Sequence, residues 1–168
     1  MPSLTPNAPE SGQESEAAFA RGLRLHQSGD LEAATTVYNT ILARDPQHAD
    51  SLHLLGTALA QTGELTQGIE ALRAALEISP NEPTFRLNYA EAQFCLGCEA
   101  LADGALADAH VSFSEAVGSN PDHQNAQMNL GVVAYQLGDL EGAESALTAV
   151  LAQAPQDPKA LHNLGIVR

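Results

Sequence analysis

The sequence predicts an all-α protein, a solenoid of about four and a half stacked helix pairs, for three reasons. Alanine and leucine, both strong helix formers, are the most abundant residues, whereas aromatic residues make up only 4% of the 168-residue chain. Glycine recurs in two series with fixed spacings. Proline recurs in a third series with the same spacings, and three agreeing series indicate internal repeats.

The repeat is 34 residues long, and one copy is seven residues longer. Successive members of each series lie 34, 41 and 34 residues apart, and the first series continues for one further step of 34. The series are Gly22, Gly56, Gly97, Gly131 and Gly165; Gly29, Gly63, Gly104 and Gly138; and Pro46, Pro80, Pro121 and Pro155. The predicted array covers residues 14–168, with repeats at about 15–48, 49–82, 83–123 and 124–157 and a partial repeat at 158–168.

Each repeat is predicted to be two helices joined by a tight turn, as the fourth repeat shows. Residues 125–135 form the first helix. Gly138 suits the left-handed conformation that ends a helix, and Asp139 can cap the start of the next one. The second helix runs from residue 141 to about residue 153, and Pro155 blocks its continuation.

The longer third repeat predicts a longer first helix. Its start keeps the common spacing as far as Asn88, and the spacing has slipped by seven residues at Gly97. Seven residues make two helical turns, so the same face returns. We expect one helix over residues 83–103, with a bulge or a broken helix as the alternative. Such a helix could shape a partner site, or the insertion could simply be tolerated.

Both ends of the chain depart from the repeat pattern. Residues 1–13 contain three prolines and mostly small polar residues, which predicts a disordered tail. The last residues begin a fifth repeat, and Leu161, Leu164 and Ile166 look like the apolar positions of an internal helix. We expect a fragment of a longer protein. A half-repeat cap and pairing with another chain are the alternatives.

The pattern resembles the tetratricopeptide repeat family. The second repeat shows it in Leu52, Leu55-Gly56, Leu59, Gly68, Leu72 and Pro80, and the fourth in Leu130-Gly131, Ala143, Leu147 and Pro155. The large aromatic residues of the family pattern are mostly leucine here. The resemblance implies a right-handed superhelix whose concave face is lined by the first helix of each pair.

The charge of the chain excludes several classes of function. Seven basic residues face 21 acidic ones, for a formal net charge of −14. Nucleic acids and anionic membrane surfaces require a basic footprint, so the expected partner is a neutral or basic protein or extended peptide. The alternative is that the charge only maintains solubility. We find no secretory signal and no membrane-spanning run, and the two cysteines fit a cytoplasmic location.

The sequence contains no recognisable catalytic motif, and it predicts no enzyme, no cofactor and no metal site. The acidic residues are scattered over predicted helix surfaces. Cys95 and Cys98 form a C-x-x-C inside a predicted helix, where a low thiol pKa is not expected, so we interpret them as small residues that fill a helix face. The histidines, including His53 and His162 at equivalent repeat positions, are interpreted as surface residues.

Asparagine recurs at one place in three repeats. Asn88, Asn129 and Asn163 each lie eight residues after a repeat proline, although asparagine is a poor helix-interior residue. The set resembles the asparagine ladder in the repeat region of O-linked N-acetylglucosamine transferases, which implies binding of an extended peptide. Solvated asparagines at the edge of the core are the alternative. The second repeat departs from the ladder, with Leu54 at this place.

Helical spacing adds further candidate contacts on the predicted concave face: Asn125, His53, Thr57, Glu91 and Gln136. The basic clamp by which some relatives bind a C-terminal carboxylate is missing, because His53, Leu87 and Met128 occupy its expected places.

The sequence therefore predicts a non-catalytic scaffold that binds a protein or peptide on its concave face. A second hypothesis is the N-terminal recruitment region of a larger bacterial-type enzyme, such as a glycosyltransferase, sulfotransferase or methyltransferase. A third is self-association through the C-terminal half repeat. The sequence identifies no partner, pathway or organism.

Overall fold

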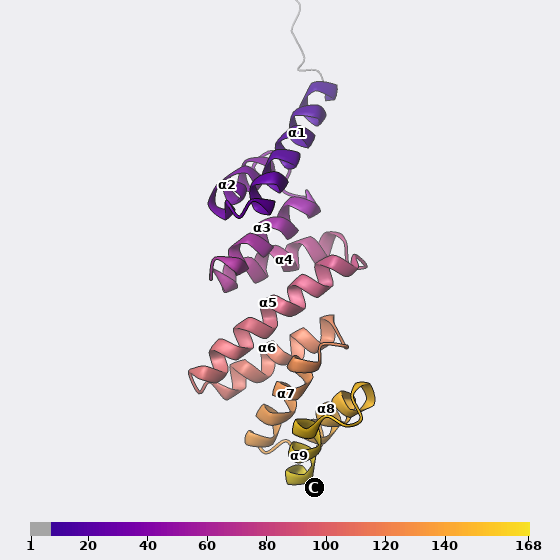
Figure 1. Ribbon diagram of the computed structural model, residues 1–168. Coiled ribbons are helices and arrows are strands. Elements are labelled where there is room, and N and C mark those ends of the chain that lie inside the picture. The colour runs from indigo at the N-terminus through magenta and orange to yellow at the C-terminus, as the bar shows by residue number, and fades with distance from the viewer. Residues whose placement is uncertain (1–7) are drawn as a thin grey trace, which may run out of the picture. The chain divides into compact units, whose positions relative to one another are not determined.

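The computed structural model describes residues 8–168, and these residues form nine α-helices and no strand (Figure 1). The predicted all-α class is confirmed. The helices are α1 (Ala8–Gln27), α2 (Leu31–Leu42), α3 (Ala49–Gln61), α4 (Leu65–Ile78), α5 (Pro83–Ala102), α6 (Leu106–Ser119), α7 (Gln124–Gln136), α8 (Leu140–Gln153) and α9 (Pro158–Val167).

Tight turns join the helices into the pairs α1–α2, α3–α4, α5–α6 and α7–α8. Each turn contains a glycine at positive φ, between 76° and 91°, which other residues adopt only with strain. Asp139 caps α8, because its carboxylate accepts a hydrogen bond from the Gly142 amide at 2.9 Å. Asp30 caps α2 in the same way through the Ala33 amide. Both the turn and the cap agree with the sequence prediction.

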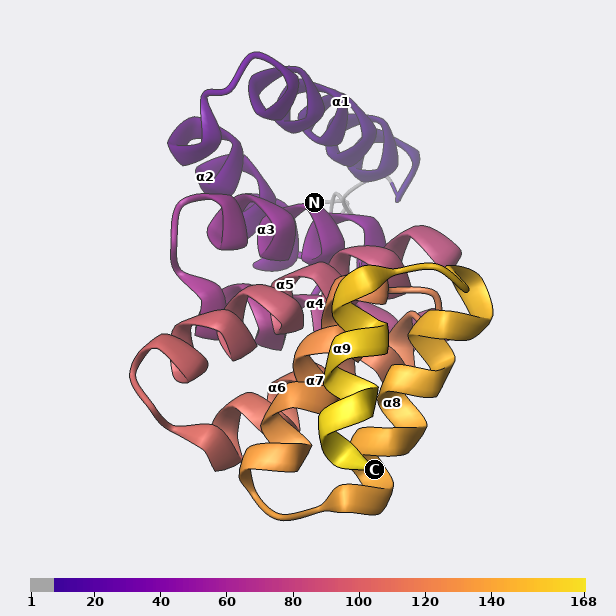
Figure 2. The ribbon, with the colours of Figure 1, turned by 60° about the horizontal axis from the view of Figure 1, so that its bottom comes forward.

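The chain divides into two compact units, Met1–Pro80 and Asn81–Arg168. In the first, Ala34 and Tyr38 of α2 pack with Leu55 of α3. In the second, Ala109 and Phe113 of α6 pack with Val133 of α7. Also in the second unit, α9 lies against α8 and α7 (Figure 2). Each core therefore joins the second helix of one pair to the first helix of the next, which is how stacked helix pairs bury their apolar faces.

Small residues allow the two helices of a pair to approach closely. A Cβ atom at Gly56 would lie 2.6 Å from the Gly68 carbonyl oxygen, and one at Gly68 would lie 2.8 Å from the Gly56 carbonyl oxygen. A Cβ atom at Gly97 would likewise lie 2.6 Å from the Phe113 ring. The repeated glycine is thus the point where each hairpin fixes its register.

The predicted long helix of the third repeat is present. α5 has 20 residues, whereas α3 and α7 have 13 each. Its last turns keep the common register, because Gly97 meets Phe113 as Gly131 meets Leu147. The additional turns therefore extend its N-terminal end, where the Arg86 side chain donates to the Ser119 carbonyl oxygen at 3.2 Å.

The N-terminal boundary differs from the prediction. The expected disordered tail covers residues 1–13, but α1 already begins at Ala8, and residues 1–7 lie outside the described residues. Extending an existing helix adds one hydrogen bond for each residue that is ordered, whereas starting a helix is costly. The alanine- and glutamate-containing segment that follows therefore favours continuation of α1 toward the N-terminus.

Candidate functional site

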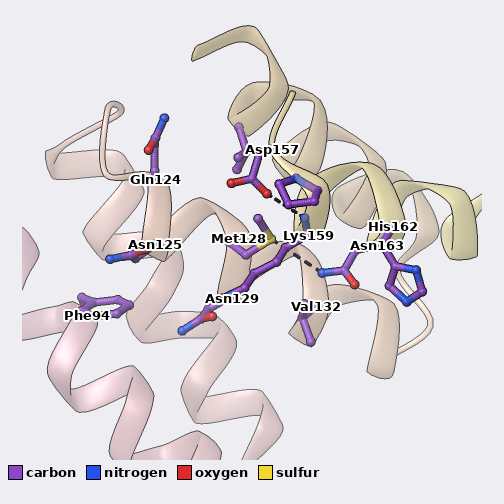
Figure 3. Close-up of a pocket in the computed structure, with 12 residues that line it drawn as sticks. Phe94, Gln124, Asn125, Met128, Asn129, Val132, Asp157, Lys159, His162 and Asn163 are labelled. Atoms are coloured by element: carbon purple, nitrogen blue, oxygen red, sulfur yellow. Dashed lines mark hydrogen bonds between the residues drawn. The ribbon is translucent and has the colours of Figure 1, made fainter. Parts of the chain in front are cut away.

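The second unit contains a hollow of about 630 Å³ along α7 and α9, with one edge on α5 (Figure 3). We call this hollow the α7–α9 groove. It is lined by amide, charged and apolar side chains together: Phe94, Gln124, Asn125, Met128, Asn129, Val132, Val150, Asp157, Pro158, Lys159, His162 and Asn163.

Helical spacing explains why several residues of α7 line the groove together. Asn125, Asn129 and Val132 lie four and three residues apart on α7 and share a helix face. The distance in sequence from the repeat glycine identifies the matching residues of α5, α7 and α9. The residues three positions before Gly97, Gly131 and Gly165 are Phe94, Met128 and His162, and all three line the groove.

Two asparagines in the groove have their amide nitrogens directed at sulfur atoms. Asn129 Nδ2 lies 3.8 Å from Cys98 Sγ. Asn163 Nδ2 lies 3.6 Å from Met128 Sδ (Figure 3). A thioether sulfur has no hydrogen to donate, so the amide nitrogen rather than the oxygen of Asn163 faces it. The amide oxygens of the half-buried Asn129 and Asn163 are then left to accept hydrogen bonds from another molecule.

Asp157 and Lys159 have different roles at the α9 edge of the groove. The Asp157 carboxylate accepts hydrogen bonds from the backbone amides of Lys159 at 2.9 Å and Ala160 at 2.8 Å, so it caps α9. The Lys159 side chain is exposed, and it has no ion-pair partner within residues 8–168. Its ammonium group is therefore available to a ligand.

His123 closes the α5 side of the site. Its Nδ1 accepts a hydrogen bond from the Ala126 amide at 3.2 Å, which leaves the proton on Nε2. Nε2 lies 3.2 Å from the Glu91 carboxylate, and the ring packs on Phe94 with the ring centres 4.8 Å apart. The imidazole thus fixes the start of α7 against α5.

The interpretation of the histidines as surface residues is wrong for His53, and two further histidines have a structural role as helix caps. His123 and His48 accept backbone hydrogen bonds as helix caps, and His53 is only 6% exposed. A neutral imidazole Nδ1 can accept from a backbone amide as the usual N-cap oxygens do, and the two caps precede α3 and α7 directly. Both His48 and His123 lie two residues after a repeat proline, just before a predicted first helix, and this position could have indicated their role as caps from the sequence.

The structure brings only part of the predicted site together. Asn125, Asn129 and Asn163 line the α7–α9 groove. Asn88 does not, because the α5 hairpin takes its register from Gly97, and the position that matches Asn129 is then Cys95. Asn88 was matched to Asn129 by its distance from the repeat proline. In the structure the helices of a pair are aligned by the repeat glycine instead, so Asn88 and Asn129 are not equivalent.

The other predicted contacts lie elsewhere. Glu91 is exposed on α5 beside His123. Gln136 lines a smaller hollow of about 200 Å³, which shares Val132 and Asn163 with the groove. His53 and Thr57 belong to α3 in the first unit, where the Thr57 hydroxyl donates to the His53 carbonyl oxygen at 2.8 Å. Among the groove residues that were not predicted as contacts, Phe94, Met128 and His162 each lie three residues before a repeat glycine, so counting back from the glycines would have identified them.

The two thiols do not form a reactive pair. Both are half-buried on α5. Burial raises the pKa of the Cys95 thiol above its ordinary value, and the nearby Glu91 carboxylate raises it further. Burial also raises the pKa of the Cys98 thiol, against the opposing effect of the Asn129 hydrogen bond. A nucleophilic thiol requires a lowered pKa, so this C-x-x-C is a packing feature.

Two features that would indicate other functions are absent from the described residues 8–168. No group of three or more histidine, cysteine, aspartate or glutamate side chains is arranged to hold a metal ion. None of the described helices combines the length and the apolar character that a membrane span requires. The groove is therefore characterised by hydrogen-bonding amides and an exposed cation.

Comparisons with known proteins identify the family. The family model of the cytochrome c-type biogenesis protein H TPR domain matches residues 26–161. The cytochrome c-type biogenesis protein CycH of Bradyrhizobium diazoefficiens is 28% identical over 138 residues, which cover 82% of this chain and 36% of that protein. The protein O-mannosyl-transferase TMTC1 of Mus musculus is 24% identical over 154 residues, which cover 92% of this chain and 16% of that protein. The chain thus spans about a third or less of these relatives.

Solved structures show the same fold. A crystal structure of MamA protein superposes with a TM-score of 0.67 and 19% identity, covering 93% of this chain and 81% of that one. A tetratricopeptide repeat protein from Parabacteroides merdae gives a TM-score of 0.65 and 21% identity, covering 92% of this chain and 59% of that one. The predicted tetratricopeptide repeat fold is confirmed.

Proposed function

Because this chain belongs to the family of the cytochrome c-type biogenesis protein H TPR domain, we propose that it binds an extended segment of a partner protein in cytochrome c-type biogenesis. The binding site is the α7–α9 groove. The chain acts as a scaffold and catalyses no reaction itself. The name of the relative CycH supports the process, and the geometry of the groove supports the kind of ligand.

The observation that favours this function is the orientation of the two equivalent asparagines. Asn129 and Asn163 are separated by one repeat, and both have their nitrogens directed at sulfur, so their oxygens are left as acceptors. An extended peptide has backbone N–H groups that must find acceptors when they leave water. Asn125, one turn before Asn129, adds a further amide. The proposed peptide-binding ladder therefore consists of Asn129 on α7 and Asn163 on α9, without Asn88 of α5.

The charge of the second unit supports a neutral or basic partner. Within residues 81–168 there are eleven acidic and three basic residues. Such an excess of negative charge attracts basic segments from a distance and repels acidic ones. In the groove itself Lys159 balances Asp157, so the amides rather than the charges select the backbone of the ligand.

The test is a binding measurement on overlapping peptides. Peptides that cover the c-type cytochromes of the source organism are arrayed, and the affinity of the strongest binders is measured by fluorescence anisotropy. The double variant Asn129→Ala/Asn163→Ala removes two hydrogen bonds of about 1 kcal/mol each, so we expect a loss of affinity of about tenfold or more. Circular dichroism should show unchanged helix content.

The matched control is Asn88→Ala, which removes an asparagine of the same predicted ladder that lies outside the groove. We expect its affinity to equal that of the wild type. An equal loss in Asn88→Ala and in the double variant would place the ligand along α5 and contradict the proposed groove. Unchanged affinity in the double variant would eliminate the amide mechanism.

A second function deserves a test, because TMTC1 is by its name a transferase and matches 92% of this chain. In that case the repeats would recruit substrate for a larger enzyme. The measurement is the intact mass of the natural protein in its source cell. A mass near 17.6 kDa supports the scaffold alone. A much larger mass fits both functions, because CycH is also longer than this chain, and a transferase assay on the larger protein then decides between them.

Two further expectations stay predictions. A cytoplasmic location follows from the composition and is testable by cell fractionation. Self-association through α9 is suggested by Leu161 and Ile166, which are each 50% exposed. Light scattering over a dilution series should then show a mass that falls with dilution.

A further inference from the structure

A second hollow, of about 470 Å³, lies on the α5–α6 hairpin, away from the α7–α9 groove. We call it the α5–α6 face. Its residues come from the last two turns of α5, the turn that follows and the first two turns of α6. Its lining residues are Leu96, Glu99, Ala100, Asp103, Ala105, Asp108, Val111 and Ser112.

Val111 gives this face an apolar residue that the other repeats lack. It is 60% exposed, more than any other large exposed hydrophobic residue within residues 8–168. It lies seven residues after the turn glycine Gly104. The residues seven positions after the other turn glycines are all polar, namely Thr36, Glu70 and Ser145. The α5–α6 face therefore carries an exposed apolar side chain at a place that is polar in the other repeats.

Glu99 distinguishes this hairpin from those of the second and fourth repeats. It lies two residues after Gly97 and is exposed. The residues at the same place in the second and fourth repeats, Ala58 and Val133, are fully buried. Within the second unit, Glu99 is therefore a charged residue at a place where the second and fourth repeats have an apolar one.

The rim of the hollow is acidic and unneutralised. Glu99, Asp103 and Asp108 surround the apolar floor, and none of these three carboxylates forms an ion pair with a residue among 8–168. No basic residue lines the hollow. The hydroxyl of Ser112, on a residue that is only 6% exposed, also lines it and has no hydrogen-bond partner in the described part of the chain.

We propose that the α5–α6 face is a second docking surface, for a segment of a partner protein that presents an apolar side chain flanked by lysine or arginine. The apolar group would cover Val111, Leu96 and Ala100. The flanking cations would neutralise the three carboxylates, and complementary charge selects this class of partner over neutral or acidic ones. A second copy of the chain is a poor occupant, because it has only seven basic residues in 168.

The test uses a capped six-residue peptide, two leucines with two lysines on each side, labelled with a fluorophore. Methyl NMR should show that the peptide perturbs Val111, Leu96 and Ala100 before other methyl groups. Val111→Ser, which copies Ser145 of the next repeat, should weaken binding about fivefold to tenfold. Because Val111 is exposed, this variant should keep the helix content of the wild type. Glu99→Lys/Asp108→Lys should abolish binding.

The matched control is Asp122→Lys/Glu141→Lys, which makes the same change in net charge at exposed positions outside the hollow. We expect it to bind the peptide within twofold of the wild type in 150 mM salt, where distant charges are screened. Equal losses in both charge variants would mean that the peptide only senses net charge, and would overturn the proposal.

Three other results would also overturn it: Val111→Ser binding as tightly as the wild type, peptide-induced shifts centred on Val132 in the α7–α9 groove, or a dimer that Val111→Ser dissociates. The last result would assign the surface to self-association. The experiment does not use Asn129 or Asn163, so failure here leaves the proposed function standing, and failure of the peptide ladder leaves this surface standing.

Discussion

In the α5–α6 hairpin Gly97 packs on the ring of Phe113, and in the α7–α8 hairpin Gly131 packs on Leu147, at the same spacing along the chain. The two hairpins nevertheless differ in length and in exposure. α5 has seven more residues than α7, and Glu99 is exposed where Val133 is buried. The comparison teaches that the contact of the repeat glycine with the second helix sets the register of a hairpin. Residues inserted before that glycine shift the earlier part of the first helix, and so change which of its side chains match those of the other repeats.

The largest effect should come from removing the side chains that the glycines contact. Phe113 and Leu147 are both fully buried. Phe113→Ala should lower the free energy of unfolding by about 4 kcal/mol and Leu147→Ala by about 3 kcal/mol, because each leaves a cavity at the centre of its hairpin. Urea unfolding followed by circular dichroism measures both. A loss below about 1 kcal/mol at either position would show that the glycine contact does not organise that hairpin.

The next largest change in stability should come from the N-caps of the second helices, where the two hairpins differ. Asp139 caps α8, whereas Ala105 occupies the N-cap position of α6 without a side-chain hydrogen bond. We expect Asp139→Ala to destabilise the protein by about 1 kcal/mol and Ala105→Asp to stabilise it by a similar or smaller amount. Thermal unfolding of the two variants checks the pair. A destabilising Ala105→Asp would mean that the added charge beside Asp103 and Asp108 outweighs the cap.

The smallest effect should appear at high pH, through the thiols that only α5 has. The folded state raises the pKa of both thiols above their ordinary value of 9.0, so it binds their protons more strongly than the unfolded chain does. The resulting stability is fully present below pH 9 and is lost as the pH rises through the raised pKa values. Between pH 8 and pH 10.5 the wild type should therefore lose more stability than Cys95→Ser/Cys98→Ser.

Tyr38 serves as an internal control for that measurement. Burial raises its pKa as well, so its ionisation also destabilises the folded state at high pH. It is present in both proteins, and its effect cancels in the difference between them. If the two pH profiles are parallel, the thiols do not contribute to the pH dependence of stability.

The repeat, its helices and its turns were all predictable from the sequence, because they depend on residues close together in the chain. A positive φ at Gly138 and a cap at Asp139 are properties of a few neighbouring residues. The length of α5 followed in the same way, since seven inserted residues return a helix to the same face. The tetratricopeptide pattern needed only spacings that can be counted in the printed sequence.

The composition of the groove depended on packing between helices that are far apart in the chain. Counting from prolines placed Asn88 with Asn129 and Asn163, but the contact of Gly97 with Phe113 set the register of α5 and put Cys95 in the matching position. Local spacing cannot choose between two registers that differ by whole helical turns. Only the close approach of two helix backbones, which one glycine permits and a larger side chain would prevent, decides which residues share a surface.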